Sequence, residues 1–272
     1  MSACAPVSLA AAKYPCRVLI PSPFLLANDL KLDKNILKAQ SDSYRRIRNT
    51  FRYLIGNLNN FNDKEKISTE QFPELEQYLL HRLWEIDQIV QECIVTFNFH
   101  LMFTTLLNFC SNDLSAFYFD IRKDTIYCDS IDSIKRRSSR TLLDLIFNFL
   151  VRWLAPSLSF TCEEAWQARG FKSSVHLEDF HKVDIKYKNS KLSSKWQKVK
   201  MVRKVITGAL EKKRADKVIG SSLESHVKIF LTDDIKKEVS DINFDEIAIT
   251  SSFEILDFKN SNNSFSLEEI QG

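Results

Sequence analysis

The sequence predicts a mainly α-helical protein, an antiparallel helical bundle followed by a small C-terminal α/β subdomain. Only 5 Gly and 6 Pro occur among 272 residues, too few for the many tight turns of a sandwich or barrel. The 20 Phe suit a bundle packed with aromatic rings. With 44% hydrophobic and 27% charged residues, the chain has the composition of a globular protein able to bury a sizeable core.

Apolar residues spaced alternately by three and four predict the long helices of the bundle. The first three stripes consist of Tyr44, Ile47, Phe51, Leu54, Leu58 and Phe61, then Leu75, Tyr78, Leu79, Leu83, Ile86, Val90 and Cys93, then Leu101, Leu106, Cys110, Leu114 and Phe117. We expect these helices over about residues 33–61, from Pro73 onward, and over 98–119, with a short connection through 120–124. A fourth helix over 133–154 ends before Pro156, and Thr161 with Glu164 resembles a capping box that opens a short helix.

Residues 169–190 are irregular, and a basic helix follows over about 194–216. The runs HVKIFLT and EIAITSSFEIL are rich in β-branched and aromatic residues and flank the polar DDIKKEVSDI, which predicts strand, helix and strand. We therefore expect an atypical N-terminal segment (1–33), a helical bundle (34–183) and a junction helix with a small α/β subdomain (184–272).

The positive charge is concentrated in two segments, although the net charge is only +3. Residues 38–52 hold five basic residues and one acid, and residues 196–217 hold eight basic residues and two acids. Such segments in a near-neutral protein indicate contact with a polyanion, nucleic acid first. The alternative is a solvated helix face.

Several functions lack support in the residues. There is no apolar run of membrane-spanning length, no glycine-rich phosphate loop and no nucleophile elbow. The 6 Cys form no CxxC pair, which predicts a reduced, cytoplasmic protein. What remains are basic helix flanks with rings nearby, at Phe117, Tyr118, Phe119 and Tyr127, which either stack on RNA bases or pack in the core.

Four stretches, in this order, match the blocks of a known family: NDLKLDKNILKAQSDSYRRIRNTFRYLIGNL, NFCSNDLSAFYFDIRKDTIYCDS, APSLSFTCEEAW and SVHLEDF. They resemble the isoleucyl-tRNA synthetases of the bacterial type. The later stretch VRKVITGALEKKRADKVIGSSLESHV is similar to the junction region that follows in this family. The resemblance covers about residues 28–256. It implies the anticodon-binding bundle of a class Ia synthetase, whose full-length enzyme uses ATP to charge tRNA(Ile) with isoleucine.

By matching these blocks, the resemblance implies an anticodon-side role for Asn49, Arg52, Asp120, Arg122 and Lys123. Arginine and asparagine can hydrogen-bond base edges, and positive flanks attract phosphates. Two further arginines are assigned to phosphate contact. Four basic residues of the junction region either hold the tRNA stem or are only solvated. These six are Arg45 and Arg48, and Lys212, Lys213, Arg214 and Lys217. Arg122 has a simpler alternative as a partner of Asp124.

The sequence departs from the family where catalysis is expected. It has neither the His-x-Gly-His signature nor the KMSKS loop, and KLSSK at residues 191–195 is interpreted as the polar lead-in to a basic helix. The C-terminal zinc knuckle is missing, so we expect no metal or cofactor in this chain, with ATP and Mg confined to a catalytic domain outside it. Residues 1–27 do not resemble a catalytic domain, and we interpret them as a mis-started reading frame.

The predicted partner is the anticodon stem-loop of tRNA(Ile), with neither DNA nor a membrane as a partner and with a monomeric state. We expect no catalysis by the chain alone. Three alternatives stay open: a free-standing tRNA- or RNA-binding module, a non-functional gene fragment, and a purely structural helical protein.

Overall fold

The computed structural model describes residues 33–257, which form two compact units that meet between Lys188 and Asn189. The first unit is a helical bundle, and the second is a long helix with a small α/β appendage. The mainly α-helical fold class is therefore confirmed. The atypical N-terminal segment predicted for residues 1–33 lies outside the described residues except for its last residue.

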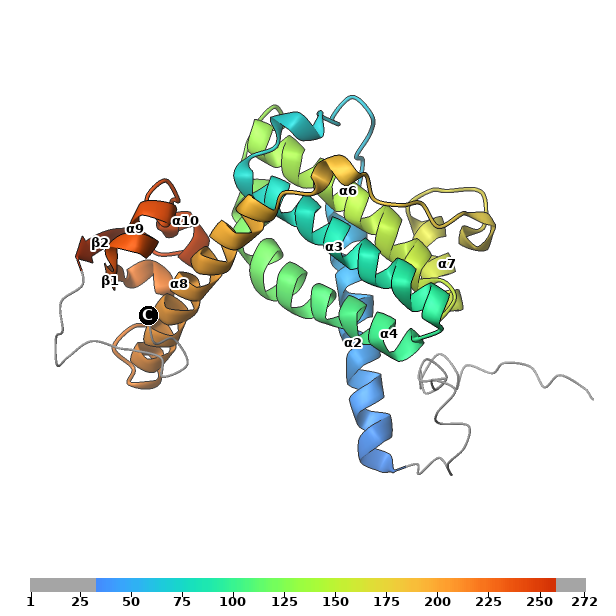
Figure 1. Cartoon of the computed structure of the whole chain (residues 1–272), viewed down its shortest axis with the longest axis horizontal. Coiled ribbons are helices and arrows are strands. Elements are labelled where there is room, and N and C mark those ends of the chain that lie inside the picture. Colours follow the sequence, from blue (N-terminus) through green and yellow to red (C-terminus); the bar gives the residue numbers. More distant parts are fainter. Residues whose placement is uncertain (1–32, 258–272) are drawn as a thin grey trace, which may run out of the picture. The chain divides into compact units, whose positions relative to one another are not determined.

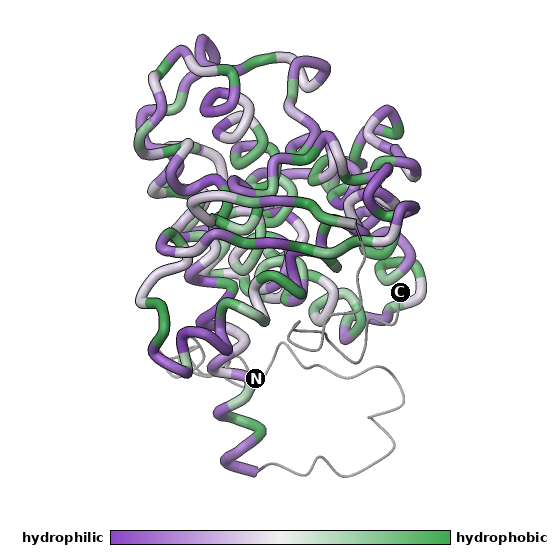
Figure 2. Tube along the Cα trace, turned by 90° about the vertical axis from the view of Figure 1, so that its left-hand side faces the viewer, coloured by the Kyte–Doolittle hydropathy of each residue, from purple (hydrophilic) through white to green (hydrophobic). Residues whose placement is uncertain are grey.

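The bundle consists of helices packed side by side (Figure 1). Its helical elements in chain order are α2 (Lys34–Asn57), α3 (Glu74–Thr96), α4 (Phe99–Asn108), the π-helical segment η4 (Phe109–Phe119), α5 (Asp120–Cys128), α6 (Ile134–Leu154) and α7 (Ser159–Ala168). Of these, α4, η4 and α5 follow one another without a break. Short 3-10 turns are η3 (Thr69–Gln71), η5 (Val175–Leu177) and η6 (Ile185–Tyr187). Helix α2 packs against η4, α6 and α7, and α3 packs against α4 and α6. Hydrophobic and hydrophilic residues alternate along these helices, as Figure 2 shows, so each helix buries one side.

The predicted stripe of α2 supplies much of the core. Ile47, Phe51, Leu54 and Leu58 are all at most 3% exposed. Asp33 begins the helix, because its carboxylate accepts hydrogen bonds from the first two free backbone N–H groups, the nearer at 2.7 Å. Every residue of the stripe predicted for α3 is also buried.

The third helix is longer than predicted. The chain stays helical from Phe99 through η4 to Cys128, so the expected connection at residues 120–124 is wrong. The sequence DIRKD is polar and resembles a loop, but Ile121 and Ile126 are buried and extend the inward side of the helix. Leu101, predicted to point inward, is 47% exposed.

Thr161 and Glu164 do not form the predicted capping box. Helix α7 begins earlier, at Ser159, and no side chain caps it. The Thr161 hydroxyl instead hydrogen-bonds Tyr44 of α2 at 2.9 Å, while Glu164 pairs with Arg48. Both residues therefore fasten α7 to α2, an arrangement that depends on contacts more than 100 residues apart in sequence.

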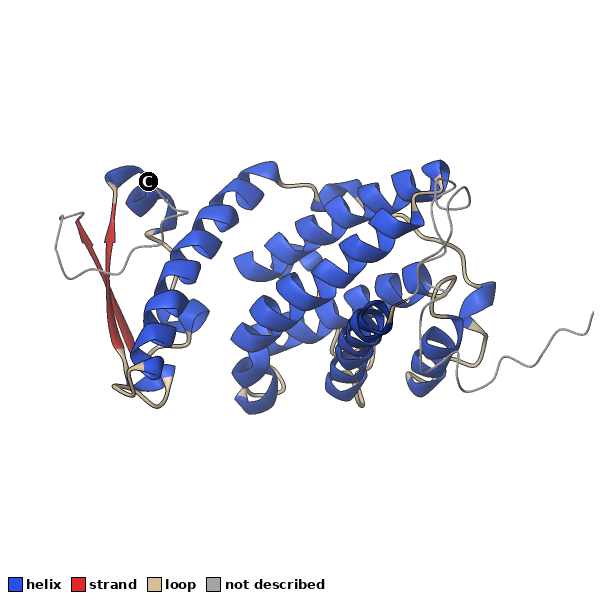
Figure 3. Cartoon of the chain, turned by 90° about the horizontal axis from the view of Figure 1, so that it is seen from below, coloured by secondary structure: helices blue, strands red, loops and turns tan. Residues whose placement is uncertain are grey.

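The second unit contains α8 (Ser190–Ala215), the 3-10 turn η7 (Ser222–Glu224), β1 (His226–Leu231), α9 (Asp233–Val239), α10 (Phe244–Ala248) and β2 (Ser252–Asp257). The two strands pair in parallel, with Ile229 opposite Ile255 (Figure 3). Helix α8 begins at Ser190, four residues before the expected start, so the residues KLSSK lie within its first turns. The first three residues of EIAITSSFEIL are helical rather than extended, and Ile249 ends that helix in a left-handed conformation.

Candidate nucleic-acid interface

The exposed side of α2 carries the first group of predicted RNA-binding residues. Arg45, Asn49 and Arg52 are spaced by four and three residues, so they share one side of the helix, and all three are exposed. Arg45 pairs with Asp42 at 3.0 Å. Within residues 33–257, the side chains of Asn49 and Arg52 form no hydrogen bond or ion pair. Both are therefore available to a ligand.

Arg48, predicted to contact phosphate, is partly exposed to solvent and also pairs with a residue of α7. Its two terminal nitrogens donate to both carboxylate oxygens of Glu164 at 3.1 and 3.2 Å, and one also donates to the Tyr44 hydroxyl at 3.2 Å. The hydrogen bond with Glu164 raises the pKa of the guanidinium further above its ordinary value. The Arg48 side chain is still 48% exposed, so a phosphate can approach it without displacing a core contact.

Arg122 is a correction to the predicted site. It lies inside the bundle at 3% exposure, where its Nε and Nη2 atoms donate to the Glu76 carboxylate at 2.6 and 3.0 Å. Tyr118 and Ser139 donate to the same carboxylate, at 3.0 and 3.3 Å. A buried charge is tolerated when it is paired and hydrogen-bonded in this way. Arg122 is thus a structural residue and does not reach the surface.

The remaining α5 candidates lie at the surface next to α2. Lys123 pairs with Asp120 at 3.1 Å, and the two side chains are 43% and 40% exposed. Tyr53 of α2 stacks on Phe119, with ring centroids 4.0 Å apart. Burial, followed by the proximity of Tyr127 and Asp120, raises the pKa of the Tyr53 hydroxyl. The exposed sides of α2 and α5 therefore adjoin at Tyr53.

This arrangement defines an α2–α5 surface composed of Asn49, Arg52, Asp120, Lys123 and Tyr127. Four rings near this surface were predicted to stack on RNA bases or to pack in the core. Phe117, Tyr118 and Phe119 are buried, whereas Tyr127 is 65% exposed and can stack on a base.

Arg46 was not among the predicted site residues, although it is exposed and lies seven residues before Tyr53 on the side of α2 next to α5. Its position relative to the apolar stripe was the signal that could have identified it.

The basic residues of α8 divide into two groups within the second unit. Near its start, Lys195 pairs with Asp241 at 2.6 Å and Lys198 with Glu238 at 2.5 Å. These contacts hold the α/β appendage. At the other end, Lys212 and Lys213 are exposed in the last turn, Arg214 pairs with Glu211, and the exposed Lys217 follows two residues after the helix. Cations in the last turn also suit the negative end of the helix dipole, so their position supports both predicted alternatives.

Other chemistry is sparse in the described part of the chain. Among residues 33–257, no group of three or more His, Cys, Asp or Glu is placed to hold a metal ion, and no helix is long and apolar enough to cross a membrane. Cys93, Cys110 and Cys162 are buried free thiols. Burial raises the pKa of the Cys110 thiol to about 12, which leaves it protonated and unreactive at neutral pH.

Known proteins match most of the chain. The family described as the anticodon-binding domain of tRNA ligase matches residues 76–229. The isoleucine–tRNA ligase of Pelagibacter ubique is 45% identical over 230 residues, which are 83% of this chain and 25% of the relative. Those of Mesorhizobium japonicum and Bartonella henselae are 43% and 44% identical over 246 residues, which are 90% of this chain and 25% of each relative. The chain spans a quarter of the length of these relatives, and it belongs to the family of tRNA ligase anticodon-binding domains.

Proposed function

We propose that the chain binds the anticodon stem-loop of tRNA(Ile) and serves as the anticodon-recognition portion of an isoleucine–tRNA ligase. The observation that carries the proposal is the identity of 43–45% to isoleucine–tRNA ligases over most of the chain. The α2–α5 surface supports it with a free guanidinium, a free amide and an exposed ring on adjoining helices. These are the groups that contact phosphates, base edges and base faces in RNA recognition.

The charging reaction belongs, in this proposal, to the three quarters of the relatives' length that the chain does not match. ATP and Mg bind there, and the present chain binds the tRNA as a monomer in the cytoplasm, without a metal and without affinity for DNA. Accordingly, the purified chain does not catalyse isoleucine-dependent exchange between ATP and pyrophosphate. Exchange above background by the purified chain contradicts this assignment.

Binding titrations with the full 272-residue chain test the proposal. The ligands are the tRNA(Ile) transcript and the same transcript with a scrambled anticodon, each at two salt concentrations. We expect tighter binding of the native transcript and a steep loss of affinity with salt, because phosphate contacts release counterions. Equal affinity for both transcripts removes the anticodon assignment, and no measurable affinity for either removes RNA binding altogether.

A free-standing module that binds tRNA in trans is the second candidate, because the free groups of the α2–α5 surface suit RNA whether or not a catalytic portion is attached. Adding a catalytic portion of an isoleucine–tRNA ligase as a separate chain discriminates between the two. Restored charging of tRNA(Ile) favours a part of the ligase. Binding without charging favours the independent module.

A further inference from the structure

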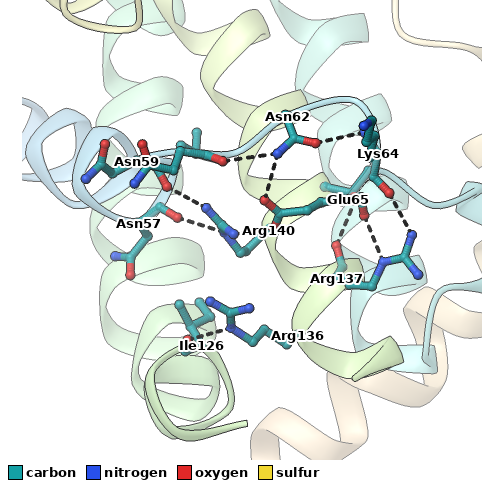
Figure 4. A network of polar contacts seen from close by, with 12 residues as sticks. Asn57, Asn59, Asn62, Lys64, Glu65, Ile126, Arg136, Arg137 and Arg140 are labelled. Atoms are coloured by element: carbon teal, nitrogen blue, oxygen red, sulfur yellow. Dashed lines mark hydrogen bonds and ion pairs between the residues drawn. The ribbon is translucent and has the colours of Figure 1, made fainter. Parts of the chain in front are cut away.

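The loop that follows α2 is held by arginines of α6. We name residues 57–66 the amide loop, since four of the ten are asparagine. Arg140 donates to the backbone carbonyls of Asn57 at 3.1 Å and Asn59 at 2.7 Å, and it forms an ion pair with Glu65 (Figure 4). Arg137 donates to the carbonyls of Glu65 and Lys64, both at 3.1 Å. The backbone of a loop without regular structure is thereby fixed along its length.

Further contacts hold the other side of the loop. Arg169 donates to the Leu58 carbonyl at 3.2 Å and to Asp144 at 2.8 Å, and Lys66 pairs with the same Asp144 at 3.4 Å. Arg140 itself is only 6% exposed. Charged groups that are hydrogen-bonded in this manner hold the loop backbone in one conformation. The loop therefore loses little conformational entropy when a ligand binds.

The outward side of the loop presents unused amides. Asn59 and Asn60 are exposed, and their side chains form no hydrogen bond within the described residues. The Asn62 amide is instead used within the loop, where it accepts from the Lys64 backbone N–H at 3.0 Å. Each free amide offers two donors and one acceptor, the pattern that pairs with the edge of an unpaired base.

The loop is continuous with the α2–α5 surface. Asn57 ends α2 one turn after Tyr53 and donates to its carbonyl at 2.9 Å. Arg136, next to the arginines that hold the loop, donates to the carbonyl of Ile126 in the last turn of α5 at 3.1 Å. The loop and the end of α5 that carries Tyr127 are therefore attached to the same start of α6.

The chemistry of the loop favours RNA over protein as its partner. Leu58 is fully buried. The Arg140 guanidinium lies over the ring of Phe61, with its Cζ atom 5.2 Å from the ring centroid. The loop therefore lacks the exposed apolar anchor on which most protein interfaces depend. It offers neutral amides and the exposed Lys64 instead, and the carboxylate of the exposed Asp63 is paired with Lys66 at 2.9 Å. Amides beside a lysine suit base edges next to a phosphate.

We propose that the amide loop reads unpaired bases of the bound RNA, with Asn59 and Asn60 as specificity-determining residues. The inference rests on the proposed function, because it requires that the chain bind the anticodon stem-loop. It adds a second contact region to the α2–α5 surface. It also assigns Arg137 and Arg140 the role of positioning residues, which hold the loop and do not touch the RNA.

The test is the double variant Asn59→Ala, Asn60→Gly in the full chain, which removes both amides and leaves the backbone contacts in place. Asn60 has a φ of 58°, a conformation that glycine adopts readily, so the fold is retained and the midpoint of thermal unfolding stays near that of the native chain. The matched control is Asn112→Ala, which removes an exposed asparagine from η4. The probes are the native tRNA(Ile) anticodon stem-loop and one with a scrambled loop.

We expect the double variant to bind the native stem-loop about tenfold or more weakly, with an unchanged salt dependence, because a neutral amide displaces no counterion. Affinity for the scrambled stem-loop should change less than about twofold, as should both affinities of the control. If the double variant binds the native stem-loop as well as the unaltered chain does, the loop does not read bases, and the proposed function survives. If the unaltered chain binds neither probe, the proposed function itself fails.

Discussion

Glu76 and Arg122 form an ion pair entirely inside the bundle, with the guanidinium Nε 2.6 Å from a carboxylate oxygen. The two residues come from α3 and α5, and Tyr118 and Ser139 donate to the same carboxylate. The pair therefore connects three helices, because Ser139 belongs to α6. It fits the helical continuation through α5, because the helix directs Arg122 inward while Asp120 and Lys123 lie at the surface.

Replacing Arg122 with Ala should cost about 3–5 kcal/mol of the free energy of unfolding, because it leaves the Glu76 carboxylate buried without its counter-charge. The double replacement Glu76→Leu, Arg122→Met should cost less than the single change, although the Tyr118 hydroxyl then lacks an acceptor. Urea unfolding of the native chain and the two variants measures this order. If the double variant is less stable than Arg122→Ala, the ion pair contributes more to the free energy of unfolding than the desolvation of its two charges costs.

Arg52 and Lys123 should affect RNA binding without affecting the fold. Each Ala substitution removes an exposed side chain, so we expect less than about 0.5 kcal/mol of change in stability. Each should weaken tRNA binding and reduce the salt slope by about one, as expected for a phosphate contact. The control is Lys172→Ala, which removes an exposed lysine from the loop after α7. If this control weakens binding equally, the attraction is a general charge effect and the α2–α5 surface has no special role.

These two predictions mark what the sequence could and could not establish. The stripe of α2 was predictable because helical periodicity is local, and it also separates the exposed Asn49 and Arg52 from the core. Arg122 was not predictable in the same way. Its burial depends on Glu76, 46 residues earlier in the chain, and a charged side chain is ordinarily found at the surface.

The same reasoning explains two further differences. Thr161 and Glu164 have the spacing of a capping box, but Tyr44 and Arg48 compete for their side chains. The first part of the amide loop was predicted as the end of a helix reaching residue 61, whereas α2 ends at Asn57, and nothing within residues 57–66 indicates that α6 holds the chain there. In each case the deciding partner is distant in sequence, so local patterns did not reveal the role of these residues.

The hydrogen bond from Arg152 lowers the pKa of Glu178 below its ordinary value. A carboxyl whose pKa is lower in the folded chain than in the unfolded chain contributes stability that is present above the ordinary value of about 4.3. This contribution is lost as the pH falls through the lowered folded pKa. Glu178→Gln should therefore be less stable than the native chain at pH 7, and the difference should shrink below about pH 4. A difference that is constant from pH 7 to pH 3, measured by urea unfolding, contradicts this linkage.

The last turn of α8 allows a prediction that separates its two interpretations. If Lys212, Lys213 and Lys217 contact the tRNA stem, replacing all three with Ala should reduce the salt slope of tRNA binding by about two to three. The loss of affinity should be the same for native and scrambled anticodons, because stem phosphates carry no anticodon information. If the lysines only complement the helix dipole, stability falls by about 0.3–1 kcal/mol for each of those within the last turn, and RNA affinity does not change. Titrations and urea unfolding of the same triple variant measure both quantities. A stem contact is therefore distinguishable from base reading by Asn59 and Asn60, whose loss affects only the native anticodon.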